Sequence, residues 1–232
     1  DLVHWEIAAH VFERLDDTPA EQLEGEQSIY GKGMWAASLR YHKDTFYVCF
    51  ASYDTGKTYI YRTKNINEPW EKRSLDGVYH HPSLLFDEDG RIYMGYGFNE
   101  VRILELNDTL TAPKEGGFER LLVEEKQDAY ISYEGAHFYK KDGTYYIFVI
   151  QWLKGNLTQR EQLCLYGDSL DGEFKKEMVF SENLGFPMKG VAQGGIVDTP
   201  EGDWYSVMYQ EHGAIGKLSL IHISEPTRPI SI

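Results

Sequence analysis

The sequence predicts an all-β fold, and three observations support that prediction. One pattern, an apolar stretch, a polar turn and a second apolar stretch centred on tyrosine, occurs four times along the 232 residues. Aromatic residues make up 14% of the chain, which favours sheets with aromatic platforms. Helical signals are nearly absent. Residues 13–28 form one long polar stretch with room for one helical turn, which we expect to be a solvated surface loop rather than a lid.

The repeated unit has the pattern of a β-propeller blade. The central tyrosines are 46, 53 and 59 residues apart, which suits blades with loops of variable length. Asp-Gly, or an equivalent such as Lys43-Asp44, occupies each turn and predicts a hairpin. A β-sandwich built from the same hairpins is the alternative. The four copies are WAASLRYHKDTFYVCFAS, HPSLLFDEDGRIYMGYG, EGAHFYKKDGTYYIFVIQ and GGIVDTPEGDWYSVMYQ, centred on Tyr47, Tyr93, Tyr146 and Tyr205.

Short runs after three of the copies predict the next strand of each blade: TYIYRT, VRILELN and QLCLYGD. The opening DLVHWE has the pattern of a blade's last element, so we expect the front of that blade to lie upstream of Asp1. The ring is then incomplete, with about four blades present. An open ring exposes a sheet face and unpaired edges, and we expect the chain to be poorly soluble for that reason.

Charge and apolar pattern exclude several classes of partner. The chain has 23 Lys and Arg against 37 Asp and Glu, a net charge of −14, which repels nucleic acid and anionic membranes. No apolar run approaches the roughly 20 residues that span a bilayer. We therefore expect neither nucleic acid nor a membrane as a partner. Cys49 and Cys164 lack the spacing of a metal or disulfide framework and are expected to be buried thiols.

The candidate site follows from the propeller geometry. The first strand of each blade runs along the central axis, so residues at the starts of these strands meet around one funnel although they are far apart in sequence. The starts of the four copies place Trp35, the pair His80 and His81, Glu134 and Gln193 there.

At these positions the sequence resembles glycosyl hydrolase family 43. Four ordered segments carry the resemblance, which covers nearly all of residues 1–216: GMWAASLRYHKDTFYV, YHHPSLLFDEDGRIYMGYG, YEGAHFYKKDGTYYIF and GVAQGGIVDTPEGDWYSVMYQEHGAIG. They are most similar to members that act on arabinose- or xylose-containing polysaccharides. The resemblance implies a five-bladed propeller and an inverting mechanism with an Asp base, a Glu acid and an Asp that orients the acid. Inversion requires acid and base carboxyls roughly 6.5–9.5 Å apart.

Glu134, in SYEGAHFY, matches the general acid of the family. Burial beside Tyr133 would raise the pKa of Glu134 toward the range that a general acid needs. His81 stands where the family pattern has the orienting Asp. A histidine can donate a hydrogen bond to Glu134, but it supplies no fixed negative charge, and a protonated one lowers the pKa of the acid. The sequence therefore predicts catalysis that is weakened or lost.

Two further readings of the acidic and histidine residues are less favoured. A metal held jointly by His80 and His81 is disfavoured, because neighbours on a strand point to opposite faces. Asp87, Asp89 and Asp142 lie in hairpin turns at the far ends of the inner strands and are expected to be turn residues. The resemblance places the general base before DLVHWE, so no residue here is assigned that role, and the chain by itself is expected to be inactive.

The remaining candidates line the pocket. Trp35 and Trp152 are predicted to stack on sugar faces, with a core position as the alternative for each. Gln193 and His212 resemble pocket-lining positions of the family, and some members hold a calcium ion near the axis. No cofactor is expected to be required. A structural calcium is a weak prediction, because one neutral imidazole does not make the oxygen-rich site that calcium prefers.

The sequence supports one leading hypothesis and two others. The first is an exo-acting inverting glycosidase that releases α-L-arabinofuranosyl or β-D-xylosyl units from oligosaccharide or polysaccharide fragments of plants. The second, motivated by His81, is a catalytically impaired propeller that binds sugars. The third is a related propeller glycosidase or phosphorylase, although no clear basic phosphate-binding cluster supports it.

The end of the chain departs from the repeat. From Leu218 the sequence reads LSLIHISEPTRPISI, which resembles translated sequencing-adapter read-through. We therefore expect residues 1–217 to form a partial propeller glycosidase domain and residues 218–232 to be a non-native tail.

Overall fold

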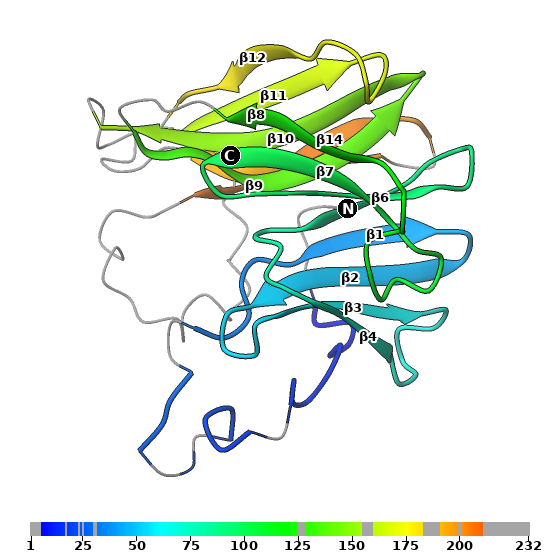
Figure 1. The fold of residues 1–232 in the computed structure, drawn as a ribbon, viewed down its shortest axis with the longest axis vertical. Coiled ribbons are helices and arrows are strands. Elements are labelled where there is room, and N and C mark those ends of the chain that lie inside the picture. The colour runs from blue at the N-terminus through cyan, green and yellow to red at the C-terminus, as the bar shows by residue number, and fades with distance from the viewer. Residues whose placement is uncertain are drawn as a thin grey trace.

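The fold is built from β-strands in antiparallel sheets (Figure 1). The structure is a computed structural model. It describes residues 6–16, 18–22, 24, 26–29, 32–124, 129–154, 160–182, 191–198 and 201–210. Within these ranges every regular element is a strand, and no helix is long and apolar enough to cross a membrane. The all-β prediction is confirmed, whereas DLVHW at the start and His212 at the end lie outside the described residues.

Four sheets follow one another along the chain, and strands adjacent in sequence are adjacent in each sheet. The first two sheets are β1 (Ser38–His42), β2 (Thr45–Ser52), β3 (Lys57–Thr63) and β4 (Glu71–Asp76), then β5 (Ser83–Phe86), β6 (Ile92–Tyr96), β7 (Glu100–Leu106) and β8 (Glu119–Glu124). The others are β9 (Ala129–Lys141), β10 (Thr144–Leu153), β11 (Glu161–Gly167) and β12 (Lys175–Phe180), then β13 (Val191–Asp198) and β14 (Trp204–Gln210).

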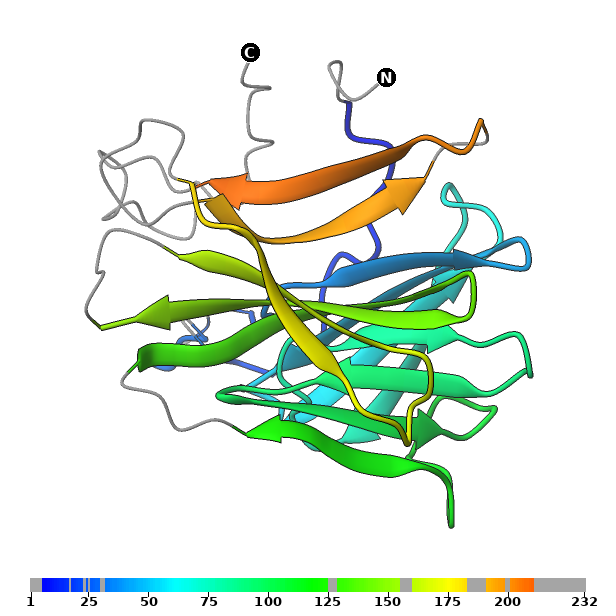
Figure 2. The same ribbon diagram turned by 90° about the horizontal axis from the view of Figure 1, so that it is seen from above.

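The sheets are arranged as propeller blades. Strand β1 contacts β5, β5 contacts β9 and β9 contacts β13, so the first strand of each blade is the innermost one (Figure 2). The four repeated tyrosines all lie on second strands, as the pattern required. This arrangement confirms an incomplete propeller with about four blades and excludes the β-sandwich alternative.

The hairpin turns explain why the repeat folds in this way. Lys43 and Asp44 have φ of 47° and 57°, and Asp142 and Gly143 have φ of 50° and 82°. Two successive positive φ values define the type I′ turn, whose twist matches that of paired strands. Each turn thus fixes the register of a first and second strand, for example His42 opposite Thr45.

Polar contacts join the innermost strands of the first three blades, which are β1, β5 and β9. Arg40 on β1 donates from Nε to the Leu84 carbonyl at 3.0 Å and from a terminal nitrogen to Ser83 Oγ at 2.8 Å and the Phe138 carbonyl at 3.0 Å. Ser83 Oγ also accepts from the Phe138 amide at 2.9 Å. Ser38 Oγ donates to the Pro82 carbonyl at 2.7 Å. These bonds fix the relative positions of the strands that carry the candidate site.

Apolar side chains fill the spaces between and within the blades. One buried cluster joins the second and third blades, and another joins the first and second. Cys49 and Cys164 are both buried free thiols, as expected. Burial raises the pKa of Cys164 to about 12.

The polar stretch 13–28 lies, where it is described, against the outer part of the first blade. Phe12 and Leu15 pack on a cluster formed by Phe50 and two tyrosines. Asp16 accepts hydrogen bonds from the Tyr59 hydroxyl at 2.6 Å and from Lys72 at 2.7 Å. The Gln22 amide donates to the Thr18 carbonyl, which closes a single helical turn. The described part of the segment is a loop against the sheet rather than a lid.

The first sheet (β1–β4) and the last sheet (β13–β14) both expose apolar side chains. Leu39 and Tyr41 on β1 are 59% and 61% exposed. Tyr205 and Val207 on β14 are 46% and 48% exposed. Such side chains lie on blade faces, where a neighbouring blade normally covers them. The exposure agrees with an incomplete ring.

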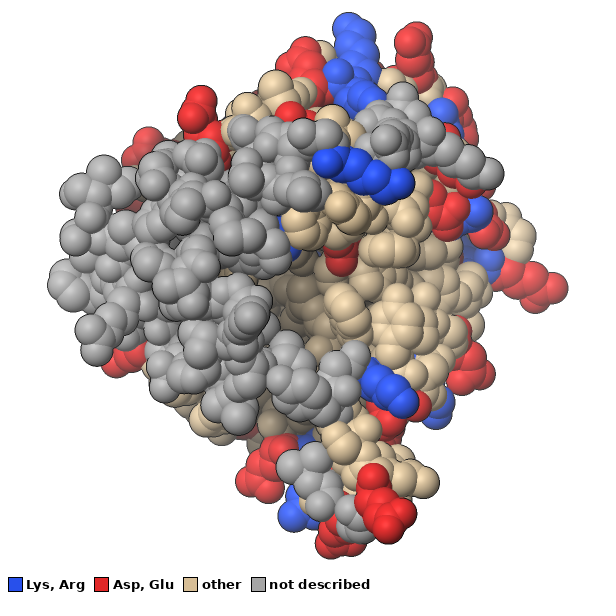
Figure 3. All heavy atoms as spheres, turned by 90° about the vertical axis from the view of Figure 1, so that its left-hand side faces the viewer, with Lys and Arg blue, Asp and Glu red and all other residues tan. Residues whose placement is uncertain are grey.

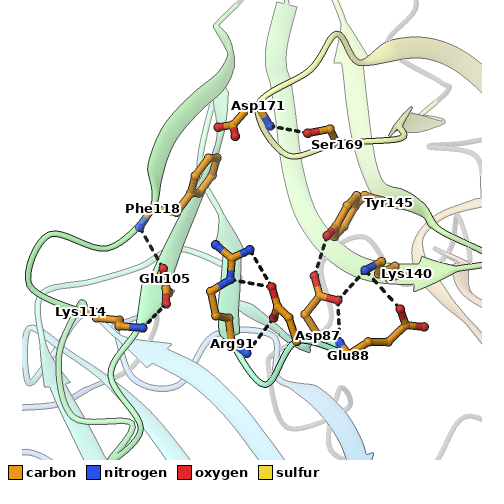
Figure 4. A network of polar contacts seen from close by, with 11 residues as sticks. Asp87, Glu88, Arg91, Glu105, Lys114, Phe118, Lys140, Tyr145, Ser169 and Asp171 are labelled. Atoms are coloured by element: carbon orange, nitrogen blue, oxygen red, sulfur yellow. Dashed lines mark hydrogen bonds and ion pairs between the residues drawn. The ribbon is translucent and has the colours of Figure 1, made fainter.

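Asp87 ties the second blade to the third at the end of the inner strands opposite the candidate site (Figure 4). Its buried carboxylate accepts from Lys140 Nζ and from the Tyr145 hydroxyl, both at 2.6 Å, and from the Glu88 amide. Burial opposes the charged form, but the bonds from Lys140 and Tyr145 hold the pKa of Asp87 below its ordinary value. The sequence-based expectation that Asp87 is a turn residue stands, with a structural role added.

We predict that Asp87→Ala lowers the free energy of unfolding by about 3 kcal/mol, because it leaves the buried phenol of Tyr145 without its acceptor and the half-buried ammonium of Lys140 with only the exposed Glu88 as a partner. The measurement is urea unfolding of the protein that contains this chain. The matched control is Asp89→Ala in the same turn, where an exposed pair with Arg91 at 2.6 Å contributes less than about 1 kcal/mol. Equal losses in the two variants would contradict the prediction.

Candidate active site

The candidate site lies at the end of the propeller where the inner strands begin. Glu134 on β9 is 8% exposed and pairs with Ile150 of β10, at a point where the register of the ladder shifts. Its Oε1 lies 3.0 Å from His80 Nε2 and 3.4 Å from His81 Nδ1. The two histidines come from the segment before β5, so the second and third blades meet at this carboxylate. The three residues that the sequence placed at the axis thus lie in contact with one another.

His80 and His81 face the same side, which corrects the sequence argument that they point to opposite faces. Both residues precede β5, which starts at Ser83, and His81 has a φ of 47°. This left-handed conformation breaks the alternation of an extended strand. The two rings therefore stack with centroids 4.0 Å apart, and both reach Glu134.

A hydroxyl and three aromatic rings surround His80. The Tyr53 hydroxyl lies 2.8 Å from His80 Nδ1. The rings of Trp35 and Phe98 lie 5.2 and 5.3 Å from the His80 ring. Tyr53 and Phe98 were not predicted from the sequence. A usable signal existed, since each follows the second strand of a blade, and second strands end where the inner strands begin.

The loop that carries Phe98 is held by β9. The Asn99 amide donates to the Tyr133 carbonyl at 2.8 Å, and Asn99 Oδ1 accepts from the Ser132 amide at 2.9 Å. Phe98 is 49% exposed at this position. The strand that carries Glu134 therefore also fixes one aromatic wall of the site.

The electrostatics of Glu134 differ from the expectation that burial raises its pKa. Burial does oppose the charged form, but the hydrogen bond from His80 and the nearby imidazoles outweigh it, and the pKa of Glu134 lies below its ordinary value. Burial, followed by the neighbouring His80, lowers the pKa of His81 to about 4. At neutral pH Glu134 is thus a carboxylate, with a neutral imidazole where the family pattern has an Asp.

Gln193 reaches the axis through a bulge. It has a φ of 56° and lies where the ladder between β13 and β14 shifts register. Its side chain lies against Gly135, where a Cβ would come within 2.8 Å of Gln193 Cγ. Gly135 also has a φ of 71°, so both its conformation and this contact require glycine.

A small hollow lies beside these residues on the axis. Figure 3 views the side of the molecule toward which the arrowheads of β2 and β10 point in Figure 1, and it shows a recess with mostly uncharged side chains on its described rim. The residues lining the hollow come from the inner strands and the segments before them: Ala36, Ala37, Ser38, His81, Pro82, Gly135, Ala136, His137 and Gln193.

The other predicted residues are placed as follows. Trp35 is 38% exposed beside the two histidines, so it has a free surface next to Glu134. Trp152 lies on β10, one strand farther out, with its ring against Tyr130 and beneath Arg160. His212 lies outside the described residues. Trp35, His81, Glu134 and Gln193 thus gather at one end of the axis, and Trp152 lies at its margin.

The described side chains of the lining offer few of the ligands that calcium prefers. They supply two imidazoles, one amide oxygen and one hydroxyl, and none of them is a carboxylate. Calcium prefers six to eight oxygen ligands. With His212 outside the described part of the chain, the weak expectation of an axial calcium stays a prediction.

Comparison with known proteins places this geometry in a family. The model for glycosyl hydrolases family 43 matches residues 1–221. A putative beta-xylosidase of Xylanibacter ruminicola is 26% identical over 98% of the chain, and a non-reducing end alpha-L-arabinofuranosidase of Bacteroides ovatus is 28% identical over 89%. The chain spans 42% and 39% of the length of these two relatives. A solved structure of a bifunctional GH43-CE protein of Bacteroides eggerthii has a TM-score of 0.82 and 35% identity over 90% of this chain and 27% of its own.

The stability of the fold is predicted to fall as the pH drops from about 6.5 to about 4. Burial in the hollow, Arg40 and His81 lower the pKa of His137 to about 4, below the unfolded value of about 6.5. Between these values the unfolded chain binds a proton that the folded chain excludes. His137→Gln removes that difference. In this pH range the slope of the unfolding free energy against pH should therefore fall by about 1.4 kcal/mol per pH unit.

The measurement is urea unfolding of the protein that contains this chain at pH 5 and pH 7. The control is His10→Gln, at an exposed histidine. A His137→Gln variant with the same pH dependence as its parent would show that His137 takes up its proton in the folded state.

Proposed function

Because this chain belongs to glycosyl hydrolase family 43, we propose that the protein containing it hydrolyses O-glycosidic bonds in plant polysaccharide fragments. The proposed reaction releases terminal α-L-arabinofuranosyl or β-D-xylosyl units with inversion. The observation that carries the proposal is the buried carboxyl of Glu134 on the inner strand β9, with the exposed ring of Trp35 beside its histidine neighbours. Relatives named as a beta-xylosidase and an arabinofuranosidase support the choice of sugars.

In this proposal Glu134 is the general acid. Protonated Glu134 donates to the oxygen of the departing sugar, while the ring of Trp35 stacks on a sugar face. The Tyr53 hydroxyl holds His80, and His80 in turn holds the carboxyl through the 3.0 Å contact. The base that activates water is assigned to none of the described residues. Asp87, for instance, is engaged by Lys140 and Tyr145.

A second candidate function is a propeller that binds the same sugars with little or no turnover. The observation that favours it is the lowered pKa of Glu134, because an acid that is ionised at neutral pH donates poorly. Residue 81 decides between the two candidates. An Asp there would add a negative charge near Glu134, whereas His81 adds a neutral imidazole.

We also propose that residues 1–217 are part of the propeller domain and that residues 218–232 are a non-native tail. The support is the loss of the repeat near Leu218. The family match ends close to this point, at residue 221.

His81→Asp is predicted to raise kcat/KM at pH 7 at least tenfold and to move the alkaline limb of the pH profile, which the general acid sets, toward higher pH. A second carboxylate beside Glu134 raises the pKa of the acid, and Asp tolerates the positive φ at this position. The assay is hydrolysis of aryl arabinofuranosides and xylosides by the protein that contains this chain. His42→Asp, at the far end of β1, is the matched control. A His81→Asp protein that stays inert would refute the simple form of the impaired-enzyme idea.

Glu134→Gln is predicted to lower kcat at least a hundredfold while KM changes little, because the amide binds substrate but donates no proton to the leaving group. Glu177→Gln, at an exposed glutamate on β12, should leave both constants unchanged. NMR of the sugar first released by the parent should show the inverted anomer. Retention of configuration would overturn the mechanism.

A further inference from the structure

We propose that His80, His81 and Glu134 form a binding site for a divalent transition-metal ion of the zinc class. The three residues each offer a ligand atom to one place. The nitrogens that contact Glu134 are His80 Nε2 and His81 Nδ1, and these are the proposed ligands together with one carboxylate oxygen of Glu134. The inference concerns metal binding alone and does not require the protein to hydrolyse glycosides.

The spacing of the ligand atoms fits such an ion. Zinc bonds of 2.0–2.2 Å at tetrahedral angles place neighbouring ligand atoms about 3.3–3.5 Å apart. Glu134 Oε1 lies 3.0 Å from His80 Nε2 and 3.4 Å from His81 Nδ1, and all three atoms lie within 4.8 Å of one another. Side-chain shifts of a few tenths of an ångström to about an ångström would bring the three atoms around one ion.

His81 provides an independent indication. It is 5% exposed, and its Nδ1 is buried with no hydrogen-bond partner among the described residues. Its contact with Glu134 at 3.4 Å lacks hydrogen-bond geometry. A buried nitrogen without a partner is costly and therefore uncommon. Coordination of a metal through its lone pair would satisfy this atom.

Tyr53 supplies the outer support that metal-binding histidines commonly have. Its hydroxyl lies 2.8 Å from His80 Nδ1. Without a metal, Nε2–H donates to Glu134. With a metal bound, the imidazole would carry its proton on Nδ1 instead, where the Tyr53 hydroxyl accepts it, and the Nε2 lone pair would face the metal. Such an outer bond fixes the tautomer and strengthens the imidazole as a ligand.

The donor set selects the class of metal. Two imidazoles and one carboxylate suit zinc and neighbouring transition metals, whereas calcium and magnesium prefer oxygen alone. Three protein ligands leave a fourth position for water or another small ligand. A metal here would also keep Glu134 ionised, so metal binding and proton donation by Glu134 exclude each other.

The test is metal titration of untagged, metal-free protein containing this chain. Cobalt(II) should produce the visible absorption of a four-coordinate site at one equivalent, and zinc should displace it. His81→Asn, which keeps a residue tolerant of positive φ, and Glu134→Gln should each weaken zinc binding at least tenfold in competition with a chromophoric chelator. Tyr53→Phe should weaken it about tenfold, because the outer bond is lost. His42→Asn, at a histidine stacked on Phe86 away from the site, is the matched control.

Circular dichroism of each variant shows whether it is folded, and Tyr53→Phe, at a residue 46% exposed, provides a conservative second variant. The proposal is overturned if the parent binds zinc no more tightly than the folded His81→Asn and Glu134→Gln variants, or if His42→Asn loses as much affinity as they do. Hydrolysis is assayed separately in the presence of a chelator. Metal binding without hydrolysis would refute the proposed function alone, whereas hydrolysis without metal binding would refute this inference alone.

Discussion

The convergence of inner strands on one axis, fixed by Arg40, is the constraint on which the site depends. A single guanidinium bonds to Leu84 and Ser83 on β5 and to Phe138 on β9, and it stacks over the ring of Tyr139 at 4.3 Å. The planar fork of arginine suits this task, because its several donors point in fixed directions. With the three strands held in register, their starting residues meet at a set distance. The contacts between Glu134 and the two histidines follow from that register.

Much of the fold could be predicted because it is encoded locally. A few neighbouring residues are enough to recognise the turn at Lys43 and Asp44 or a strand centred on tyrosine. The hairpins and their repetition could therefore be predicted from the sequence. Arg40 was missed because its role depends on two other blades. Tyr53 and Phe98 were missed because the search stopped at the starts of the inner strands and left out the ends of the second strands.

The residues that gather near the axis were named from the sequence, but the direction of the pKa shift of Glu134 was not. Alternation along a strand suggested that His80 and His81 face apart, and a single positive φ at His81 reversed that geometry. Once both rings face Glu134, burial is no longer the deciding influence on the carboxyl. Burial raises the pKa of Glu134, but the hydrogen bond from His80 and the nearby charged groups together lower it by more. The positive φ of His81 brings a second ring to the same carboxyl, and no residue pattern contains that angle.

The same arrangement that weakens Glu134 as an acid makes it a better ligand. The hydrogen bond from His80 stabilises the carboxylate form, which is the form a metal requires, and both imidazoles place a nitrogen atom close to it. A proton and a metal ion therefore compete for one oxygen, and residue 81 sets the balance. An aspartate there favours the proton, because like charges raise the pKa of a neighbouring carboxyl. A histidine favours the metal, because it replaces a repelling charge with a further ligand. On the two proposals together, the residue at position 81 sets which chemistry the site favours.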